Sequence, residues 1–202
     1  MDADKKISRT AKKSQTEIML GGEKLILSGN INLLTAANLS KHSGYSVGNI
    51  YHHFKNLDTV FINIFLKKRL EIFLQLADEI NKFPKNNSCE ELCKILVNKV
   101  FESTNKLKIK MLQYLFKIVL TKSGEPEKIN LIIDVLIDPL IECRKRNKSN
   151  SFRKIEEAEM RLLLRSLQAF IRTPFLENQA IAGTLDHKKL TLDLCQKLFS
   201  IK

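Results

Sequence analysis

Apolar residues recur three and four positions apart along most of this chain, which is the spacing of one face of an α-helix. In residues 187–201, for example, Leu190, Leu194 and Leu198 fall on a single stripe. Glycine, proline and asparagine interrupt the pattern, and such residues end helices. We therefore predict an all-α fold of about nine helices, over residues 14–28, 35–44, 46–54, 57–82, 88–104, 107–122, 126–147, 152–172 and 187–201.

Residues 35–54 predict two short helices joined by a tight turn. Thr35 is a good N-cap, because its hydroxyl can accept a hydrogen bond from a backbone N–H of the first turn. Gly44 stands where this helix should end, since glycine tolerates the left-handed conformation of helix termini. Ser46 then caps a second helix, with Ile50 and Phe54 on its buried side. This is the layout of a helix-turn-helix, whose second helix reads the major groove of DNA.

The helix expected over residues 14–28 contains the pair Gly21 and Gly22. Each glycine costs about 1 kcal/mol relative to alanine inside a helix, but small residues allow a neighbouring helix to pack closely. Residues 1–13 form a polar arm with the basic residues Lys5, Lys6, Arg9, Lys12 and Lys13. We expect this arm to be mobile in the free protein; the alternative is contact with the phosphate backbone or minor groove of DNA.

The later helices carry two prolines and a polar stripe. Pro139 lies inside the helix expected over 126–147 and predicts a kink there, and Pro174 should stop the helix over 152–172. Polar residues recur at every fourth position of the first of these helices: Asn130, Asp134, Asp138 and Glu142. We interpret them as a narrow solvent-facing stripe on a mostly buried helix and not as a ligand site.

The helix over 57–82 is apolar on more than one face, which suits a connector between two cores. We therefore predict two domains, residues 1–56 and residues 57–202. The hydrophobic content of 44% and the charged content of 28% are ordinary for a soluble globular chain. The net charge of +12 favours a polyanionic partner. Residues 61–202 carry +9 of it and residues 1–60 only +3, so charge alone does not locate a DNA-binding surface.

Other features bear on location and chemistry. No apolar run approaches the roughly 18 residues of a membrane span, and the N-terminus lacks a signal peptide's apolar segment. The four cysteines lack a close-spaced disulfide framework, so we expect reduced thiols and a cytoplasmic protein without membrane contact. Phosphate-binding glycine loops and hydrolase motifs are absent from the sequence. We therefore expect no enzymatic activity and no cofactor.

A metal site is not expected either. His52 and His53 are adjacent, and adjacent side chains on a helix point about 100° apart, so the two cannot readily share one ion. Cys89 and Cys93, four residues apart, have no third ligand within sequence reach. We interpret these two cysteines as small buried hydrophobic residues.

The helix-turn-helix stretch resembles the DNA-binding domain of TetR-type (tetracycline-repressor-like) transcriptional regulators. Positions that agree in register with that family's pattern are Thr35, Leu39, Gly44, Ser46, Gly48, Ile50, Tyr51, His53 and Phe54. Ser40 and Ser43 replace alanine, Tyr45 replaces valine, and Leu57 stands where a lysine often touches a phosphate. The resemblance does not extend residue by residue past about residue 60. It implies an N-terminal three-helix DNA-binding bundle and a C-terminal helical bundle that binds a ligand and dimerises.

Base contacts are expected from the first turn of the second helix. Asn49 can bond adenine edges, Val47 can meet a thymine methyl group, and Gly48 lets the backbone approach closely. Val47 is alternatively a core residue, because it lies three positions before Ile50. The other candidate DNA-binding residues are Thr35, Lys41, Ser46, Tyr51, His52, His53 and Lys55. Among these, the resemblance assigns the tyrosine and histidines to phosphates, and the lysines supply ionic contacts.

The resemblance also implies an effector cavity and a dimer interface. Candidate effector-binding residues are Phe65, Asn98, Phe101, Met111, Gln113, Tyr114 and Phe116, with Phe73 as a further lining residue. Alternatively, each of these residues packs in a filled core and contacts no ligand. Candidate dimer residues are Leu162, Leu163, Leu167, Phe170, Leu190, Leu194 and Leu198, which could instead complete the core of a monomer.

The sequence therefore predicts a TetR-like regulator, usually a repressor in this family, that binds a palindromic operator as a homodimer and is released by a small-molecule effector. The alternative is a helical interaction protein that keeps the fold but reads no specific DNA, which Leu57 and the modest N-terminal charge favour.

Overall fold

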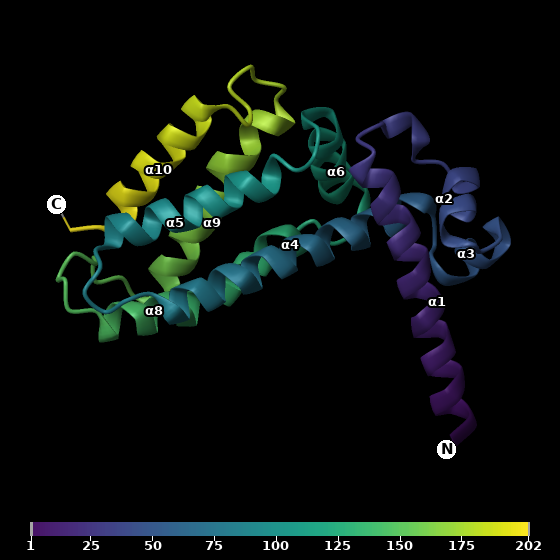
Figure 1. Ribbon diagram of the computed structural model, residues 1–202, viewed down its shortest axis with the longest axis horizontal. Coiled ribbons are helices and arrows are strands. Elements are labelled where there is room, and N and C mark those ends of the chain that lie inside the picture. The colour runs from purple at the N-terminus through teal and green to yellow at the C-terminus, as the bar shows by residue number, and fades with distance from the viewer. Residues whose placement is uncertain (1, 202) are drawn as a thin grey trace. The chain divides into compact units, whose positions relative to one another are not determined.

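The computed structural model describes the backbone of residues 2–201 and the side chains of residues 11–201. This part of the chain forms ten α-helices and two short 3-10 helices, labelled η (Figure 1). Its only β-type pairing is an isolated antiparallel bridge between Phe152 and Ser200, so the predicted all-α class is confirmed. The elements are α1 (Asp2–Leu27), η1 (Ile31–Leu33), α2 (Ala36–Ser43), α3 (Val47–His53), α4 (Leu57–Lys82), α5 (Cys89–Thr104), α6 (Ile109–Lys122), α7 (Lys128–Leu131), η2 (Ile132–Leu136), α8 (Ile137–Arg146), α9 (Glu157–Leu176) and α10 (Leu185–Phe199).

The chain divides into two compact units. The N-terminal unit contains Met1–Lys67 and Lys110–Pro126, and the C-terminal unit contains Lys68–Ile109 and Glu127–Lys202. The boundary expected between residues 56 and 57 falls inside the N-terminal unit, because the first part of α4 packs on α1 and almost all of α6 belongs to this unit. The two compact units therefore differ from the division expected from the sequence.

Close packing explains the glycine pair in α1. A methyl group on Gly21 would lie 2.8 Å from the backbone nitrogen of Ser43 in α2, and one on Gly22 would lie 2.6 Å from Cδ1 of Ile64 in α4. Real Cβ atoms do not approach so closely, so a larger residue at either position forces the neighbour to move. The prediction that small residues permit close helix packing here is confirmed.

Helix α1 begins at Asp2 and not at residue 14 as expected, so the described part of residues 1–13 extends this helix. Residues 2–13 contain no glycine or proline, and nothing in them breaks a helix. The side chains of Lys5, Lys6 and Arg9 lie outside the described residues, and those of Lys12 and Lys13 are exposed.

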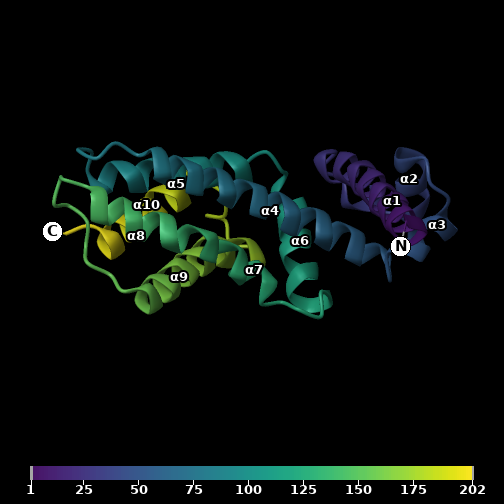
Figure 2. The same ribbon diagram turned by 90° about the horizontal axis from the view of Figure 1, so that it is seen from below.

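The core of the C-terminal unit is shared by several helices. α10 packs against both α5 and α9, and α5 and α10 run side by side in Figures 1 and 2. Leu76 and Ile80 of α4, Leu92 of α5 and Leu164 of α9 are almost completely buried in one hydrophobic cluster. Burying such a side chain contributes about 1.5–3 kcal/mol, so this cluster stabilises the unit.

The helix expected over 126–147 with a kink at Pro139 is instead broken before that proline. α7 and α8 are separated by the 3-10 segment η2. Pro139 is the third residue of α8, in the first turn, where its missing N–H is not needed by the helix. The predicted kink is therefore wrong, because the break upstream turns an interior proline into a first-turn proline.

The predicted ends of the following helix are also wrong. Residues 152–156, which were expected to be helical, are not. Their segment pairs instead with the C-terminal end of the chain: the Arg153 N–H donates to the Phe199 carbonyl at 2.8 Å, and the Ile201 N–H donates to the Ser151 carbonyl at 2.8 Å. At the other end the helix continues through Pro174 to Leu176. Pro174 removes only the N–H that the Phe170 carbonyl would accept, and the helix continues for two residues beyond it, so the predicted stop is wrong.

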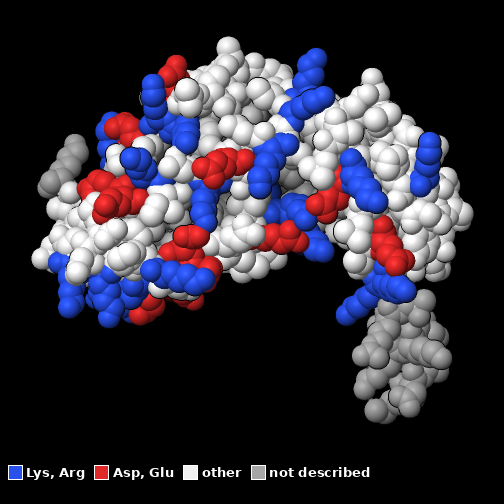
Figure 3. Space-filling model, viewed as in Figure 1, with Lys and Arg blue, Asp and Glu red and all other residues white. Residues whose placement is uncertain are grey.

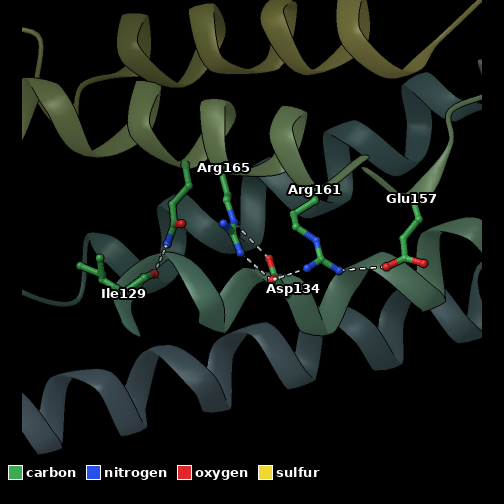
Figure 4. Close-up of polar contacts among 6 residues, drawn as sticks. Ile129, Asp134, Glu157, Arg161 and Arg165 are labelled. Carbon is green, nitrogen blue, oxygen red and sulfur yellow. Dashed lines mark hydrogen bonds and ion pairs between the residues drawn. The ribbon is translucent and has the colours of Figure 1, made fainter. Parts of the chain in front are cut away.

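The polar stripe expected to face solvent is partly enclosed. Asp134 of η2 accepts from Arg165 of α9 at 2.7 Å, and Arg161 lies 3.6 Å from the same carboxylate oxygen (Figure 4). Asn130 of α7 accepts from Arg172 of α9 at 2.9 Å. The stripe therefore joins the α7–η2 segment to α9, which the spacing alone does not reveal.

Candidate functional site

Local capping builds the helix-turn-helix as predicted. The Thr35 hydroxyl accepts from the Asn38 N–H at 3.3 Å at the start of α2, and the Ser46 hydroxyl accepts from the Asn49 N–H at 3.2 Å at the start of α3. Gly44 ends α2 with φ of 77°, the left-handed conformation that a glycine adopts without strain.

The turn of this motif is tied to α1 by a contact that the sequence reasoning missed. The hydroxyl of Tyr45 donates a hydrogen bond to the carboxylate of Glu17. Tyr45 stands where the resembling family usually has valine, and this departure was the one signal available in the sequence. The bond fixes the turn between α2 and α3 relative to α1.

Helix α3 is anchored on one side and open on the other. Ile50 is completely buried and Phe54, which follows the helix, is 5% exposed. Val47, Gly48 and Asn49 of the first turn are exposed, with 38% of the surface of Val47 accessible. The alternative assignment of Val47 to the core is therefore wrong, and the first turn is free to contact a partner.

Gly48 has no structural need to be glycine within this chain. It lies in the regular helix α3, and a Cβ atom added to it would have no neighbour within 4 Å. Alanine is the better helix former by about 1 kcal/mol. The empty space outside Gly48 allows another molecule to approach the α3 backbone.

The candidate phosphate-binding residues lie around this turn. All of them are exposed except His53, which is half-buried. The His52 ring meets the His53 ring edge-on, with 5.2 Å between centroids. Leu57, where the resembling family often has lysine, is half-buried at the start of α4, next to Asn56, whose side chain accepts from the Thr59 N–H at 2.8 Å.

Among the described residues, charge marks no continuous basic surface on the face drawn in Figure 3. On the face seen in Figure 3, lysine and arginine side chains are spread over both units and alternate with aspartate and glutamate. Near α3 the exposed cations are Lys41 and Lys55.

The candidate effector residues are divided between the two units. Phe65, Met111, Gln113, Tyr114 and Phe116 belong to the N-terminal unit, whereas Asn98 and Phe101 of α5 belong to the C-terminal unit. The Phe65 and Phe116 rings meet edge-on, with 5.2 Å between centroids. Phe101 packs on the ring of His187, with 5.0 Å between centroids.

Tyr114 has a polar partner within its own unit. Its hydroxyl donates to Oδ1 of Asp58 in the first turn of α4 at 3.2 Å, and Nζ of Lys122 lies 2.8 Å from Oδ2 of the same carboxylate. Burial, followed by the negative charge of Asp58, raises the pKa of Tyr114 to about 12. These contacts attach α6 to the helix that follows the helix-turn-helix.

Two arginines that the sequence reasoning missed lie in the C-terminal unit. Arg69 of α4 falls four residues after Phe65 and four before Phe73, and Arg172 of α9 falls four after Gln168. Both therefore occupy positions of an otherwise buried helical stripe, and this was the signal in the sequence.

The candidate dimer residues on α9 and α10 fall into two groups. Leu162, Phe170 and Leu190 expose large apolar side chains, with 67% of the surface of Leu162 accessible. Leu167 is buried in the core of the unit, and the remaining three pack against that core: Leu163, Leu194 and Leu198.

Among residues 11–201, whose side chains are described, His, Cys, Asp and Glu form no group of three or more that could hold a metal ion. Over the same residues, no helix combines the length and the apolar character needed to cross a membrane. Cys89, Cys93, Cys143 and Cys195 are free and buried.

Comparison with solved structures identifies the fold. A protein from Mesorhizobium loti MAFF303099, assigned to the TetR family, superposes with a TM-score of 0.65 at 11% identity, covering 95% of this chain and 98% of that one. The transcriptional regulator FadR from Bacillus subtilis, solved in complex with stearoyl-CoA, gives 0.58 at 17% identity over 89% and 96%. The fatty acid degradation regulator FadR from Bacillus halodurans gives 0.55 at 20% identity over 91% and 93%.

The chain has the fold of TetR-family transcriptional regulators. No protein-family model and no curated protein sequence matches it. The resemblance carried by residues 35–54 therefore agrees with the fold of nearly the whole chain, at low sequence identity.

Proposed function

We propose that this chain is a TetR-like DNA-binding transcriptional regulator, acting as a repressor, that binds a palindromic operator as a homodimer and is released by a small-molecule effector. The observation that carries the proposal is the exposed first turn of α3, where Val47, Gly48 and Asn49 face solvent while Ile50 and Phe54 anchor the helix. A helix that reads the major groove needs a buried side that anchors it to the protein and a first turn that is free to contact DNA. The TetR-type fold supports the same conclusion.

Each side chain around α3 has a defined role in this proposal. The Asn49 amide reads an adenine edge, and Val47 contacts a thymine methyl group. Ser46 accepts from Asn49 N–H, which leaves its own O–H to donate to a phosphate. The exposed residues that complete the phosphate contacts are Thr35, Lys41, Tyr51, His52 and Lys55, together with the half-buried His53.

Selection of bound sequences from random duplex DNA tests the proposal directly. The expected product is an enriched palindrome whose half-sites are about one helical turn apart. Asn49→Ala should change the preferred base at one position of each half-site, by about 1–3 kcal/mol. Lys41→Ala should weaken binding to all sequences alike and lower the slope of log K against log salt by about 1.

An interaction protein without specific DNA binding is the second candidate. Leu57 favours it, because this half-buried side chain cannot supply the phosphate contact that lysine makes in the resembling family. If no palindrome is enriched at moderate salt, the regulator proposal is wrong and this second candidate replaces it.

For the dimer, we propose that the exposed apolar side chains of α9 and α10 meet their copies in a second subunit. Leu162 and Phe170 lie eight residues apart on α9 and therefore on one face. Light scattering at micromolar concentration should give the mass of a dimer, and Leu162→Glu should give a monomer. Leu74→Glu is a matched control, since Leu74 of α4 is also exposed. A monomeric wild-type protein would contradict the assignment.

For the effector, we propose binding among the helices from α4 onward. The Bacillus subtilis FadR structure contains stearoyl-CoA, which makes a ligand with an apolar body a reasonable expectation for this chain. Effector binding favours a spacing of the two recognition helices that no longer fits successive major grooves, about 34–36 Å apart. The effector needs only to bind that state more tightly.

A further inference from the structure

Helix α6 adds positive charge to the unit that contains the helix-turn-helix. That unit consists of Met1–Lys67 and Lys110–Pro126, and the second segment holds almost all of α6. The first segment contains nine lysines and arginines and five acidic residues, and the second adds three lysines against one glutamate. α6 is distant from the helix-turn-helix in sequence, yet it belongs to the same compact unit and contributes to its charge.

Lys122 of α6 brings one of these charges close to α3. Its Nζ atom lies 2.8 Å from Oδ2 of Asp58 in the first turn of α4. Asp58 follows shortly after His53, the last residue of α3, and the exposed Lys55 stands between them. Lys55 and Asp58 are three positions apart, so their Cα atoms lie within about 11 Å of each other. Lys122 and Lys55 therefore flank the same short segment that follows the candidate recognition helix.

The ion pair of Lys122 is not needed to hold α6 in place. The Lys122 side chain is 55% exposed, and such pairs contribute little to stability because water and salt screen them. α6 is also attached to α4 by the hydrogen bond from Tyr114 to Asp58 at 3.2 Å and by the edge-on contact of the Phe65 and Phe116 rings. A role of Lys122 other than folding is therefore open.

The ammonium group of Lys122 can bind a second acceptor. It carries three N–H donors, and Asp58 takes one of them. Because the side chain is more than half exposed, an oxygen of another molecule can reach the remaining two. A phosphate oxygen of DNA is a charged acceptor, which a lysine binds more strongly than a neutral one. Asp58 by itself would repel a phosphate, and Lys122 offsets that charge.

We propose that Lys122 is a further phosphate-binding residue of the DNA-binding surface, supplied by α6 and not by the helix-turn-helix. In the complex its ammonium group bridges the Asp58 carboxylate and a phosphate of the DNA backbone. It places a cation at the start of α4, where Leu57 has none. Lys122 contacts no base, so it strengthens binding to all sequences alike. This inference rests on the proposed function, because it concerns the same surface.

Lys122→Gln tests the contact in the full-length protein, with the palindromic duplex obtained by selection and a scrambled duplex. Fluorescence anisotropy at about 50–200 mM salt gives Kd and the slope of log K against log salt. We expect binding about fivefold weaker per subunit at about 0.15 M salt and a slope smaller by about 0.9 per subunit, which is the counterion release of one phosphate. Both duplexes should lose the same factor, and Lys122→Arg should restore it.

Two further variants separate a phosphate contact from other roles. Lys117→Gln removes an equal charge from α6, but the exposed Lys117 lies five residues before Lys122, about 140° around the helix. It should leave the slope unchanged. Asp58→Asn breaks the ion pair, keeps the lysine and removes an acid near the phosphate, so binding should stay equal or become tighter. If the pair only positioned α4, Asp58→Asn would weaken binding as much as Lys122→Gln does.

The inference is overturned by an unchanged slope in Lys122→Gln, by an equal loss in Lys117→Gln, or by weaker binding in Asp58→Asn. Loss of folding in Lys122→Gln, seen by circular dichroism, would also overturn it, because the lysine would then be structural. A protein that selects a palindrome but does not respond to Lys122→Gln keeps the proposed function and loses this residue. If no palindrome is selected, the proposed function and this inference fail together.

Discussion

Tyr114 of α6 donates a hydrogen bond to Asp58 of α4 across 56 residues of sequence, with 3.2 Å between the hydroxyl and Oδ1. Lys122, two turns further along α6, reaches the other oxygen of the same carboxylate at 2.8 Å. Asp58 lies in the first turn of α4, directly after the helix-turn-helix. The N-terminal unit therefore contains a polar connection between α6 and the element that follows the candidate recognition helix.

Tyr114→Phe should lower the free energy of unfolding by about 1 kcal/mol, because a half-buried hydrogen bond to a carboxylate is lost while the ring remains. Lys122→Met is the control, and its exposed ion pair should contribute less. Urea unfolding at pH 7 measures both. A larger effect for Lys122→Met than for Tyr114→Phe would show that the hydroxyl is not the main link.

Tyr114 also predicts that the stability of the folded protein depends on pH in the alkaline range. Its pKa of about 12 in the folded chain lies above the unfolded value of 10, so the folded state holds the proton more firmly. The stability from this group is present below pH 10 and is lost as pH rises through about 12. Absorbance titration at 295 nm should show a phenol that ionises near pH 12 in the wild type and is missing from Tyr114→Phe.

Gly48→Ala should separate stability from DNA binding. The added methyl group meets nothing within 4 Å in the free chain, so stability should stay equal or rise by up to about 1 kcal/mol. Operator affinity should fall, because the methyl group occupies the space through which DNA approaches α3. Denaturation and a binding titration on the selected duplex measure the two effects. Unchanged affinity would remove Gly48 from the DNA-binding residues.

Gly21→Ala provides the opposite case. Its methyl group would lie 2.8 Å from the Ser43 backbone nitrogen, so α1 and α2 must separate, and we expect a loss of about 1–3 kcal/mol of stability. Equal stability of the Gly21→Ala and Gly48→Ala variants would contradict the close packing of α1 on α2.

His187 predicts that the stability of the folded protein depends on pH in the acid range. Its Nδ1 accepts from the Gly183 N–H at 3.1 Å, which places the ring proton on Nε2, and its ring contacts Phe101, Phe170 and Phe175. Burial lowers the His187 pKa below 6.5, and the Phe170 carbonyl opposes this to a smaller extent. That carbonyl has no helical N–H to accept, because the residue four positions later is Pro174.

Because the unfolded chain binds the His187 proton at a higher pH than the folded chain does, stability is complete above about pH 6.5 and falls as pH drops below it. The slope from this single group is at most about 1.4 kcal/mol per pH unit. His187→Gln should remove that part of the slope in urea titrations between pH 8 and 5. An unchanged slope would assign the acid sensitivity to other groups.

The four cysteines should be unreactive in the folded protein. A hydrogen bond with Cys93, followed by burial, raises the pKa of Cys89; contact with Cys195 raises that of Cys93, and burial raises that of Cys143. Since the thiolate is the reactive form, Ellman's reagent should label none of them at pH 8 until guanidinium unfolds the chain. Rapid labelling of the folded protein would show that the C-terminal unit opens locally.

The helix-turn-helix could be derived from sequence because its signals are local. Thr35, Gly44 and Ser46 each act on backbone groups within three or four residues, so caps and turn follow from short-range chemistry. The same applies to the buried side of α3, where helical spacing alone places Ile50 and Phe54. The amphipathic pattern likewise predicted the all-α class.

Other outcomes needed the tertiary structure. Whether Pro139 and Pro174 interrupt a helix depended on where that helix begins and ends. Distant residues influence those ends: the Arg153 N–H, in the segment before α9, donates to the Phe199 carbonyl across 46 positions of sequence. Tyr114 with Asp58 and Gln168 with Ile129 are likewise distant in sequence. Helical periodicity shows which face of a helix is buried but not which helix covers it.

The sequence by itself therefore determined the fold class and the helix-turn-helix, including the candidate recognition helix. Long-range packing decided which polar groups meet in the interior, because only there do distant residues share one low-dielectric environment.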